Sequence, residues 1–256
     1  MRRRDVRARP RGAIMSDFKP GLLLSGDTDI LNRAVDAFLA QPVDLDSTDR
    51  PPRPFAARQT TIARPVTVRG PGTFLGRATR TITFAPFEGE GWWFDRTDLP
   101  EDLPTRVSVR NVWTTGQIVS NIVLRSGAPH NYVRMVEHIV ALRPGLGLDN
   151  LLVRIDSGDP PLFDRGSLDL IEALDNAGLV ETELPARHWP VREPVCVCPA
   201  HGAFVCLSPC RTPDPRLTID AAIDFRTAIG KQRIRFHLDN DIALTAAVAR
   251  TNTSAS

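Results

Sequence analysis

The stretch MVEHIVALRPGLGLDN, residues 135–150, decides the interpretation of the fold, because it sets an acidic residue and a histidine on an apolar helix just before a glycine-rich turn. Apolar residues recur there at spacings of three, four and seven, and this period predicts a helix that begins near Asn131. The apolar positions are Met135, Val136, Ile139, Val140 and Leu142. Pro144, Gly145 and Gly147 then predict that the helix breaks into a loop.

The adjacent residues Glu137 and His138 allow two interpretations. They are an incidental polar pair on a core helix, which is the commoner case for a lone pair, or a metal ligand beside a general base. A neutral imidazole is a good zinc ligand, and a carboxylate that does not bind the metal can take a proton from metal-bound water. Adjacent helical residues point about 100° apart, so the two side chains can serve separate roles.

The flanking segments predict an α+β fold. Alternating and β-branched residues predict strands, and apolar residues at helical spacing predict helices. The strands are expected at 58–70, 77–86, 91–99, 105–115 and 147–156, with GPGTFLG (70–76) as a hairpin turn. The helices are expected at 25–40, 166–180 and 239–250. Asp27 or Thr28 is expected to cap the first helix, and Ser167 and Gly178 to begin and end the second.

The order of these segments predicts two tandem β-sheet/α-helix sandwich units, the second incomplete. Residues 1–57 are expected to be an N-terminal extension and linker, partly disordered. Residues 58–184 form the first α+β domain. Residues 185–256 form a partial second domain that opens with a short antiparallel meander over 190–225.

The composition and charge of the chain limit the classes of partner that are expected. The chain has 256 residues, 42% of them apolar, and a net charge of +2, so no nucleic acid partner is expected. No apolar run approaches 18 residues, so no membrane span is expected. The arginine-rich stretch 1–12 is interpreted as a disordered leader, or as sequence upstream of a start at Met15. Without a secretory signal, the compartment is expected to be cytoplasmic and reducing, with no disulfides.

Three further groups of residues have competing interpretations. The four cysteines and His201 lie within residues 196–210. They are interpreted either as a structural zinc site or, for the cysteines, as small buried apolar side chains. His237 and Asp241 have the i, i+4 spacing of a metal-binding pair, but two residues are a weak match. Trp92 and Trp93 face opposite sides of a strand, so at most one can stack on a sugar, and core and surface packing is the expected role.

Residues 135–156, followed by DPPLFDRGS at 159–167, resemble the zinc-dependent UDP-3-O-acyl-N-acetylglucosamine deacetylases of lipid A biosynthesis. That family shows a Val-Glu-His helix, then Gly-Leu-Gly-Ile-Asp-Asn and a Pro-Ile-Met-Asp-Gly-Ser loop. Collinear matches extend the resemblance over residues 58–251. They are 58–77 with the glycine turn, FDRTDL (94–99), NVWTT (111–115), IDAAIDFRTAIGKQ (219–232) and AVART (247–251).

The resemblance implies a hydrolase with zinc between two α+β sandwiches, acting on a UDP-linked acylated amino sugar. Metal-activated water attacks the amide carbonyl of the N-acetyl group, and acetate is released. By motif, His138 is implied as a zinc ligand, Glu137 as the general base and Thr251 as a residue that polarises the carbonyl. Asp164 and Ser167 match a structural loop, in which Arg165 is an insertion.

The sequence departs from the family where the zinc site is completed. The family supplies a His and an Asp from a His-Lys-x-x-Asp-x-x-Gly-Asp helix, with a further histidine as general acid, and this chain ends before that region. Three hypotheses follow: a zinc-dependent deacetylase, a non-catalytic relative that binds a nucleotide sugar or a protein, and a truncated or half-enzyme completed by another chain. A homo- or hetero-oligomer could cover open sheet edges.

Overall fold

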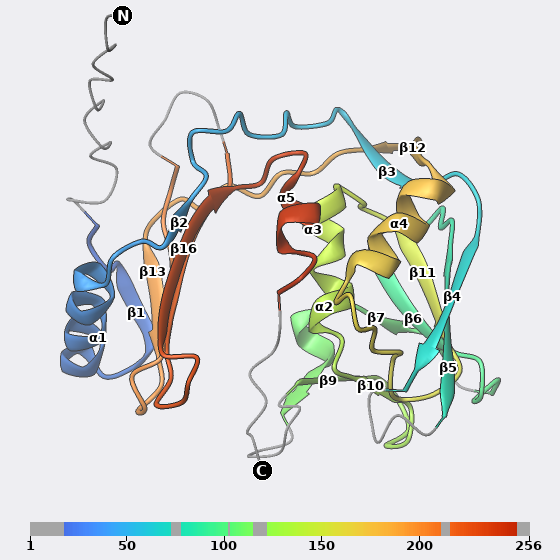
Figure 1. Cartoon of the computed structure of the whole chain (residues 1–256), viewed down its shortest axis with the longest axis horizontal. Coiled ribbons are helices and arrows are strands. Elements are labelled where there is room, and N and C mark those ends of the chain that lie inside the picture. The colour runs from blue at the N-terminus through green and yellow to red at the C-terminus, as the bar shows by residue number, and fades with distance from the viewer. Residues whose placement is uncertain (1–17, 73–77, 102, 115–121, 211–215, 250–256) are drawn as a thin grey trace, which may run out of the picture. The chain divides into compact units, whose positions relative to one another are not determined.

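A computed structural model of the chain describes residues 18–72, 78–101, 103–114, 122–210 and 216–249 (Figure 1). The chain divides into two compact units. The first combines residues 1–42 with 189–215, and the second combines residues 43–188 with 216–256. The mixture of helices and several sheets confirms the α+β class. The domain boundaries expected at 57/58 and 184/185 stay predictions.

The first unit is a three-stranded sheet with one helix. Strand β1 (Leu22–Gly26) runs parallel to β13 (Val195–Cys198), which pairs antiparallel with β14 (Val205–Leu207). Helix α1 (Thr28–Ala40) begins as predicted, because the Asp27 carboxylate accepts a hydrogen bond from the backbone N of Ile30 at 2.9 Å. The buried core of this unit is small. It consists of Leu31, Val35, Cys196 and Cys198, with partly buried neighbours such as Phe204.

A disulfide joins Cys196 on β13 to Cys206 on β14. The antiparallel register sets these two residues directly opposite each other, so their sulfur atoms come within bonding distance. The prediction that disulfides are absent is therefore wrong. It rested on the compartment, whereas the pairing is decided by strand register. Cys198 is a buried free thiol and Cys210 is exposed.

The second unit is built on a five-stranded sheet in the order β4-β5-β11-β6-β7. Strand β11 runs antiparallel to β5 and parallel to β6. The strands are β4 (Val66–Pro71), β5 (Thr79–Ala85), β6 (Trp92–Arg96), β7 (Thr105–Arg106) and β11 (Leu151–Ile155). The antiparallel pairing of β4 with β5 confirms the predicted hairpin, although residues 73–77 of its turn lie outside the described residues.

One large core lies against this sheet. Trp92, Phe84 and Val153 from the sheet are fully buried. Helix α4 (Leu168–Ala177) adds an apolar face to the same core, which confirms the predicted amphipathic helix. That face consists of Leu170, Ile171, Leu174 and Ala177. Gly178 ends the helix with φ +76°, as predicted, a conformation that disfavours side chains.

Three smaller sheets and several short helical segments complete the described part of the second unit. The two-stranded sheet is β3 (Arg58–Ile62) with β12 (Leu179–Pro185). One three-stranded sheet is β8 (Val112–Thr114), β9 (Ile122–Arg125) and β10 (Tyr132–Arg134). The other is β15 (Thr218–Asp224), β16 (Lys231–His237) and β2 (Leu45–Asp46). The helical segments are the 3-10 turn Val109–Asn111, α2 (Glu137–Val140), α3 (Leu142–Leu146) and α5 (Ile242–Ala246).

Several predicted strands differ in extent. The stretch 58–70 forms two strands that join different sheets, because Pro65 cannot donate to a ladder. The stretch 105–115 forms β7 and β8 with a 3-10 turn between them. The meander predicted over 190–225 is confirmed for its first hairpin, since β13 pairs antiparallel with β14, and is wrong for its third strand. Strand β13 also pairs with β1, whereas β15 belongs to another sheet, in which it pairs with β16. Among the described residues, no helix is long and apolar enough to cross a membrane.

Candidate active site

Glu137 and His138 begin the short helix α2, which follows strand β10 directly (Figure 1). The prediction of a helix from Asn131 is wrong in its first half, because Tyr132 to Arg134 pair with β9 instead. Pro144 and Gly145 also differ from the prediction, since both lie inside α3. The turn begins only at Gly147, which ends α3 with φ +69° and ψ +35°.

The change from strand to helix is made at Met135. Its φ is +53°, the only positive φ of a non-glycine residue among those described. A side chain in this left-handed region costs roughly 1 kcal/mol or more, and such conformations cluster at functional sites. Met135 precedes Glu137 by two residues, so the strained backbone lies at the start of the candidate site.

The side chains of α2 divide into a buried and an accessible set. Val136 and Ile139 are 3% and 2% exposed and belong to the large core. Glu137 is exposed and His138 is half-buried. Because Val136 and Ile139 are packed in the core, the orientation of the short helix is fixed. In this orientation the carboxylate of Glu137 faces away from the core and is accessible to water and to a ligand.

The turn after α3 is held by buried hydrogen bonds rather than by ligands. The Asn150 side chain is fully buried. Its Oδ1 accepts from the backbone N of Gly91 at 2.7 Å, and its Nδ2 donates to Gln59 Oε1 at 2.9 Å. The indole N of Trp92 donates to the Leu148 carbonyl at 2.8 Å. The GLGLDN motif therefore fixes α2 and α3 against β3 and β6.

Asp149 and Thr60 make a second link between this turn and β3. The backbone N of Thr60 donates to Asp149 Oδ2 at 3.0 Å, and the Thr60 hydroxyl donates to the Gly147 carbonyl at 2.5 Å. Sequence reasoning assigned Asp149 and Asn150 to a motif without giving them these structural roles. Their signal was a polar Asp-Asn pair at the start of a buried strand.

Arg53 holds the C-terminal end of α3, next to the turn. Its guanidinium donates to the carbonyls of Pro144 at 2.8 Å and Gly145 at 2.5 Å, and to the Asp239 carbonyl at 2.8 Å. Its Nε donates to Asn240 Oδ1 at 3.2 Å. A cation suits the C-terminal carbonyls of a helix. Burial lowers the pKa of Arg53, and the nearby Asp239 opposes that change. The stretch 1–57, interpreted as an N-terminal extension and linker, thus carries a structural anchor.

The loop of Asp164 and Ser167 contacts the end of α5. The backbone N of Ser167 donates to the Ala247 carbonyl at 2.8 Å, and a Cβ on Gly166 would lie 2.3 Å from that oxygen. The prediction that Ser167 caps α4 by its side chain is wrong. Its backbone is helical (φ −86°, ψ 0°), whereas capping side chains need an extended residue, and the structure as described shows no capping bond. The inserted Arg165 pairs with Asp169 and Glu172 on α4.

Helix α5 packs against both α3 and α4. At its contact with α3, Gly145 lies close to Ala243 of α5. This packing brings together the helix after Glu137 and His138, the loop 164–167 and the segment that leads to residue 249. Thr251, the third predicted site residue, lies outside the described residues. Its predicted role stays a prediction.

His237 and Asp241 do not form the helical pair that their spacing suggested. His237 ends strand β16, is 4% exposed, and its Nδ1 lies 2.9 Å from the Thr218 hydroxyl. Burial lowers the pKa of His237, and Arg216 acts in the same direction. Asp241 precedes α5, and its backbone N donates to Asp239 Oδ1. The i, i+4 argument needs one continuous helix, so it does not apply.

The residues available for a metal are few. Two of the four cysteines are in the disulfide and cannot serve as thiolates. Across the described ranges, no group of three or more His, Cys, Asp or Glu side chains could hold a metal ion. A catalytic zinc takes three protein ligands, so the described residues do not fit a complete zinc site.

Fold and site together define an α+β protein with an accessible carboxylate and an imidazole at a strained helix start. Comparison with known proteins gives the particular family. The family model described as LpxC, UDP-3-O-acyl N-acetylglycosamine deacetylase, matches residues 59–255. This match covers well over half of the chain, and the chain belongs to that family.

Curated relatives agree with this family at modest identity, and each carries the name UDP-3-O-acyl-N-acetylglucosamine deacetylase. The protein from Bdellovibrio bacteriovorus is 32% identical over 187 residues, 69% of this chain and 55% of the relative. The protein from Trichormus variabilis is 29% identical over 205 residues, 76% of this chain and 68% of the relative. The protein from Brucella ovis is 29% identical over 189 residues, 72% and 62%. The matched regions thus cover 55% to 68% of these relatives.

Proposed function

We propose that this chain takes part in removing acetate from a UDP-linked, acylated N-acetylglucosamine, a cytoplasmic step of lipid A biosynthesis. The supporting observation is the family match over residues 59–255, which contains Glu137, His138 and Thr251 in one collinear block. The strained backbone at Met135 and the exposed carboxylate of Glu137 are consistent with a reactive site at the start of α2.

Glu137 is the general base in this proposal. A water molecule attacks the amide carbonyl carbon and gives a proton to the Glu137 carboxylate. The Glu137 carboxyl then gives this proton to the nitrogen as the C–N bond breaks, and the amine of the sugar and acetate are released. General bases of this kind typically contribute 10²- to 10⁴-fold in rate.

Zinc is the expected cofactor, with His138 as one ligand. Since the described residues do not fit a complete zinc site, no step is assigned to the metal here. Further ligands would come from outside the described residues or from another chain. The incomplete zinc site among the described residues also supports a second candidate function, that of a non-catalytic family member that binds a nucleotide sugar or a protein. It is equally consistent with a half-site that another chain completes.

The test combines metal content and acetate release on the full chain, purified without chelators or a histidine tag. Glu137→Gln is expected to lower acetate release at least 100-fold, and His138→Ala to lower zinc per chain as well. Glu181→Gln and His201→Ala, which change exposed residues of the same types, are the controls. Unchanged acetate release in Glu137→Gln would refute its role. If the unchanged chain contains no zinc and releases no acetate, the binding function is favoured.

A further inference from the structure

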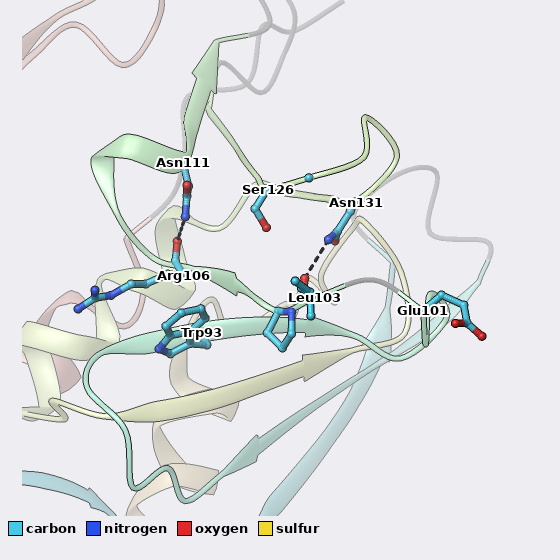
Figure 2. Close-up of a pocket in the computed structure, with 9 residues that line it drawn as sticks. Trp93, Glu101, Leu103, Arg106, Asn111, Ser126 and Asn131 are labelled. Atoms are coloured by element: carbon cyan, nitrogen blue, oxygen red, sulfur yellow. Dashed lines mark hydrogen bonds between the residues drawn. The ribbon is translucent and has the colours of Figure 1, made fainter.

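A pocket of about 440 Å³ lies in the second unit (Figure 2). Strands β6 and β7 provide Trp93 and Arg106, and the 3-10 turn before β8 provides Asn111. The segment between β9 and β10 provides Ser126 and Asn131. Its volume falls in the range of about 300–1,000 Å³ typical of small-molecule sites. Neither Glu137 nor His138 lines it.

The Trp93 indole forms an aromatic wall with a fixed orientation. Its Nε1 donates to the Glu90 carbonyl at 3.0 Å, and the Arg106 guanidinium lies 5.9 Å from the ring centroid. Trp93 is half-buried, whereas the adjacent Trp92 is fully buried in the core. Trp93 can therefore present a ring to a ligand at no cost to the core. Leu103 and Pro104 continue the apolar surface.

The neutral polar side chains of the pocket are held by hydrogen bonds within the protein. The Asn111 side-chain nitrogen donates to the Arg106 carbonyl at 2.9 Å, and that of Asn131 donates to the Leu103 carbonyl at 2.9 Å (Figure 2). Each bond uses one of the two N–H donors of its amide and fixes the side chain, which has a second N–H and an acceptor oxygen for a ligand. The Ser126 hydroxyl shares a 2.8 Å hydrogen bond with Thr105.

The charges in the pocket argue against an anionic ligand. Arg106 and Glu101 contribute one charge of each sign. A diphosphate or carboxylate would need several cationic or N–H donors, and Arg106 is the one cation among the described residues that line the pocket. A sugar ring offers several hydroxyl donors on its rim and an apolar C–H face that fits against an indole.

We propose that this pocket binds the pyranose ring of a saccharide. The apolar face of the ring lies against Trp93, and its hydroxyls donate to the side-chain oxygens of Asn111 and Asn131. This binding does not depend on Glu137 or His138. The ring can belong to a nucleotide-linked amino sugar or to another saccharide, because the recognised chemistry is the same.

The test is titration of the full chain with N-acetylglucosamine, followed by calorimetry or ligand-observed NMR. The sugar is expected to bind, and Trp93→Ala to weaken binding about tenfold, the upper end of one aromatic contact. Asn111→Ala, on the pocket rim, tests the same site with less risk to folding and is expected to weaken binding several-fold. Trp189→Ala removes an exposed tryptophan of the other unit and is expected to change nothing. His138→Ala is expected to bind normally, even if it abolishes deacetylation.

Titration with UDP-N-acetylglucosamine and with UDP identifies the source of the ring. Binding of the nucleotide sugar with the same dependence on Trp93 supports the pocket and assigns it to a nucleotide-linked sugar. Binding of free N-acetylglucosamine alone supports the pocket and assigns it to another saccharide. The proposal is overturned if the unchanged chain does not bind N-acetylglucosamine, if Trp93→Ala and Asn111→Ala bind it as tightly as the unchanged chain, or if UDP alone displaces it.

Discussion

The turn Gly147–Asn150 and the cysteine hairpin Val195–Leu207 are both short connecting structures, but they are stabilised differently. The turn belongs to a unit with a large buried core, and buried hydrogen bonds to β3 and β6 fix it. The hairpin belongs to a unit whose described part has four buried core residues, and a disulfide crosses its two strands. A large core excludes water and makes polar contacts effective, whereas a small core gains more from a covalent link.

The largest expected effect comes from Asn150→Ala. The substitution leaves the Gly91 backbone N and the Gln59 side chain without their buried partner, so we expect a loss of about 3 kcal/mol in the free energy of unfolding. Urea unfolding measures it, and Asn176→Ala on the exposed face of α4 is the matched control. A loss no greater than that of the control would mean that the turn does not depend on this network.

Breaking the disulfide should have the next largest effect, confined to the first unit. The bond closes a loop with a sequence separation of 10, which corresponds to about 2.5 kcal/mol of chain entropy. Cys206→Ala, or reduction of the unchanged chain, should speed amide hydrogen exchange in α1, β1 and β13. Exchange in β5 and β11 should stay unchanged. Equal protection before and after reduction would show that the four-residue core is sufficient by itself.

Arg53→Ala should have a smaller effect that is specific to the helix–turn segment. It removes the donors to Pro144, Gly145 and the Asp239 carbonyl, and we expect a loss of about 2 kcal/mol. Amide exchange should rise in α3 and α5. Arg165→Ala removes an exposed guanidinium that pairs only with α4 carboxylates in the described structure, and no measurable change is expected there. Equal behaviour of the two variants would argue against an anchoring role for Arg53.

Local sequence patterns predicted the structural features that depend only on residues close together in the sequence. Asp27 caps α1 because its side chain needs only the N–H three residues later. Gly178 ends α4 because only the local backbone angle decides it. The apolar period around Val136 and Ile139 predicted a helix, and both residues are buried, although the helix is shorter than predicted.

The candidate site was predicted only in part. Glu137 and His138 were found from a local motif, and the structure sets them at the start of a short helix. The anchors around them were missed, since Arg53 and Asn150 contact residues 59 to 187 positions away in sequence. Such contacts leave no periodic pattern near either residue.

The sequence by itself determined the α+β class, the Asp27 cap of α1, the end of α4 at Gly178 and the motifs that join the chain to its family, because each depends on neighbouring residues. Only the tertiary structure decided that Cys196 meets Cys206, that Tyr132 to Arg134 form a strand rather than a helix, and that Trp93 lines a pocket while Trp92 lies in the core. Strand register and burial depend on partners far away in the chain, and those partners override local preference when they supply hydrogen bonds and a buried surface.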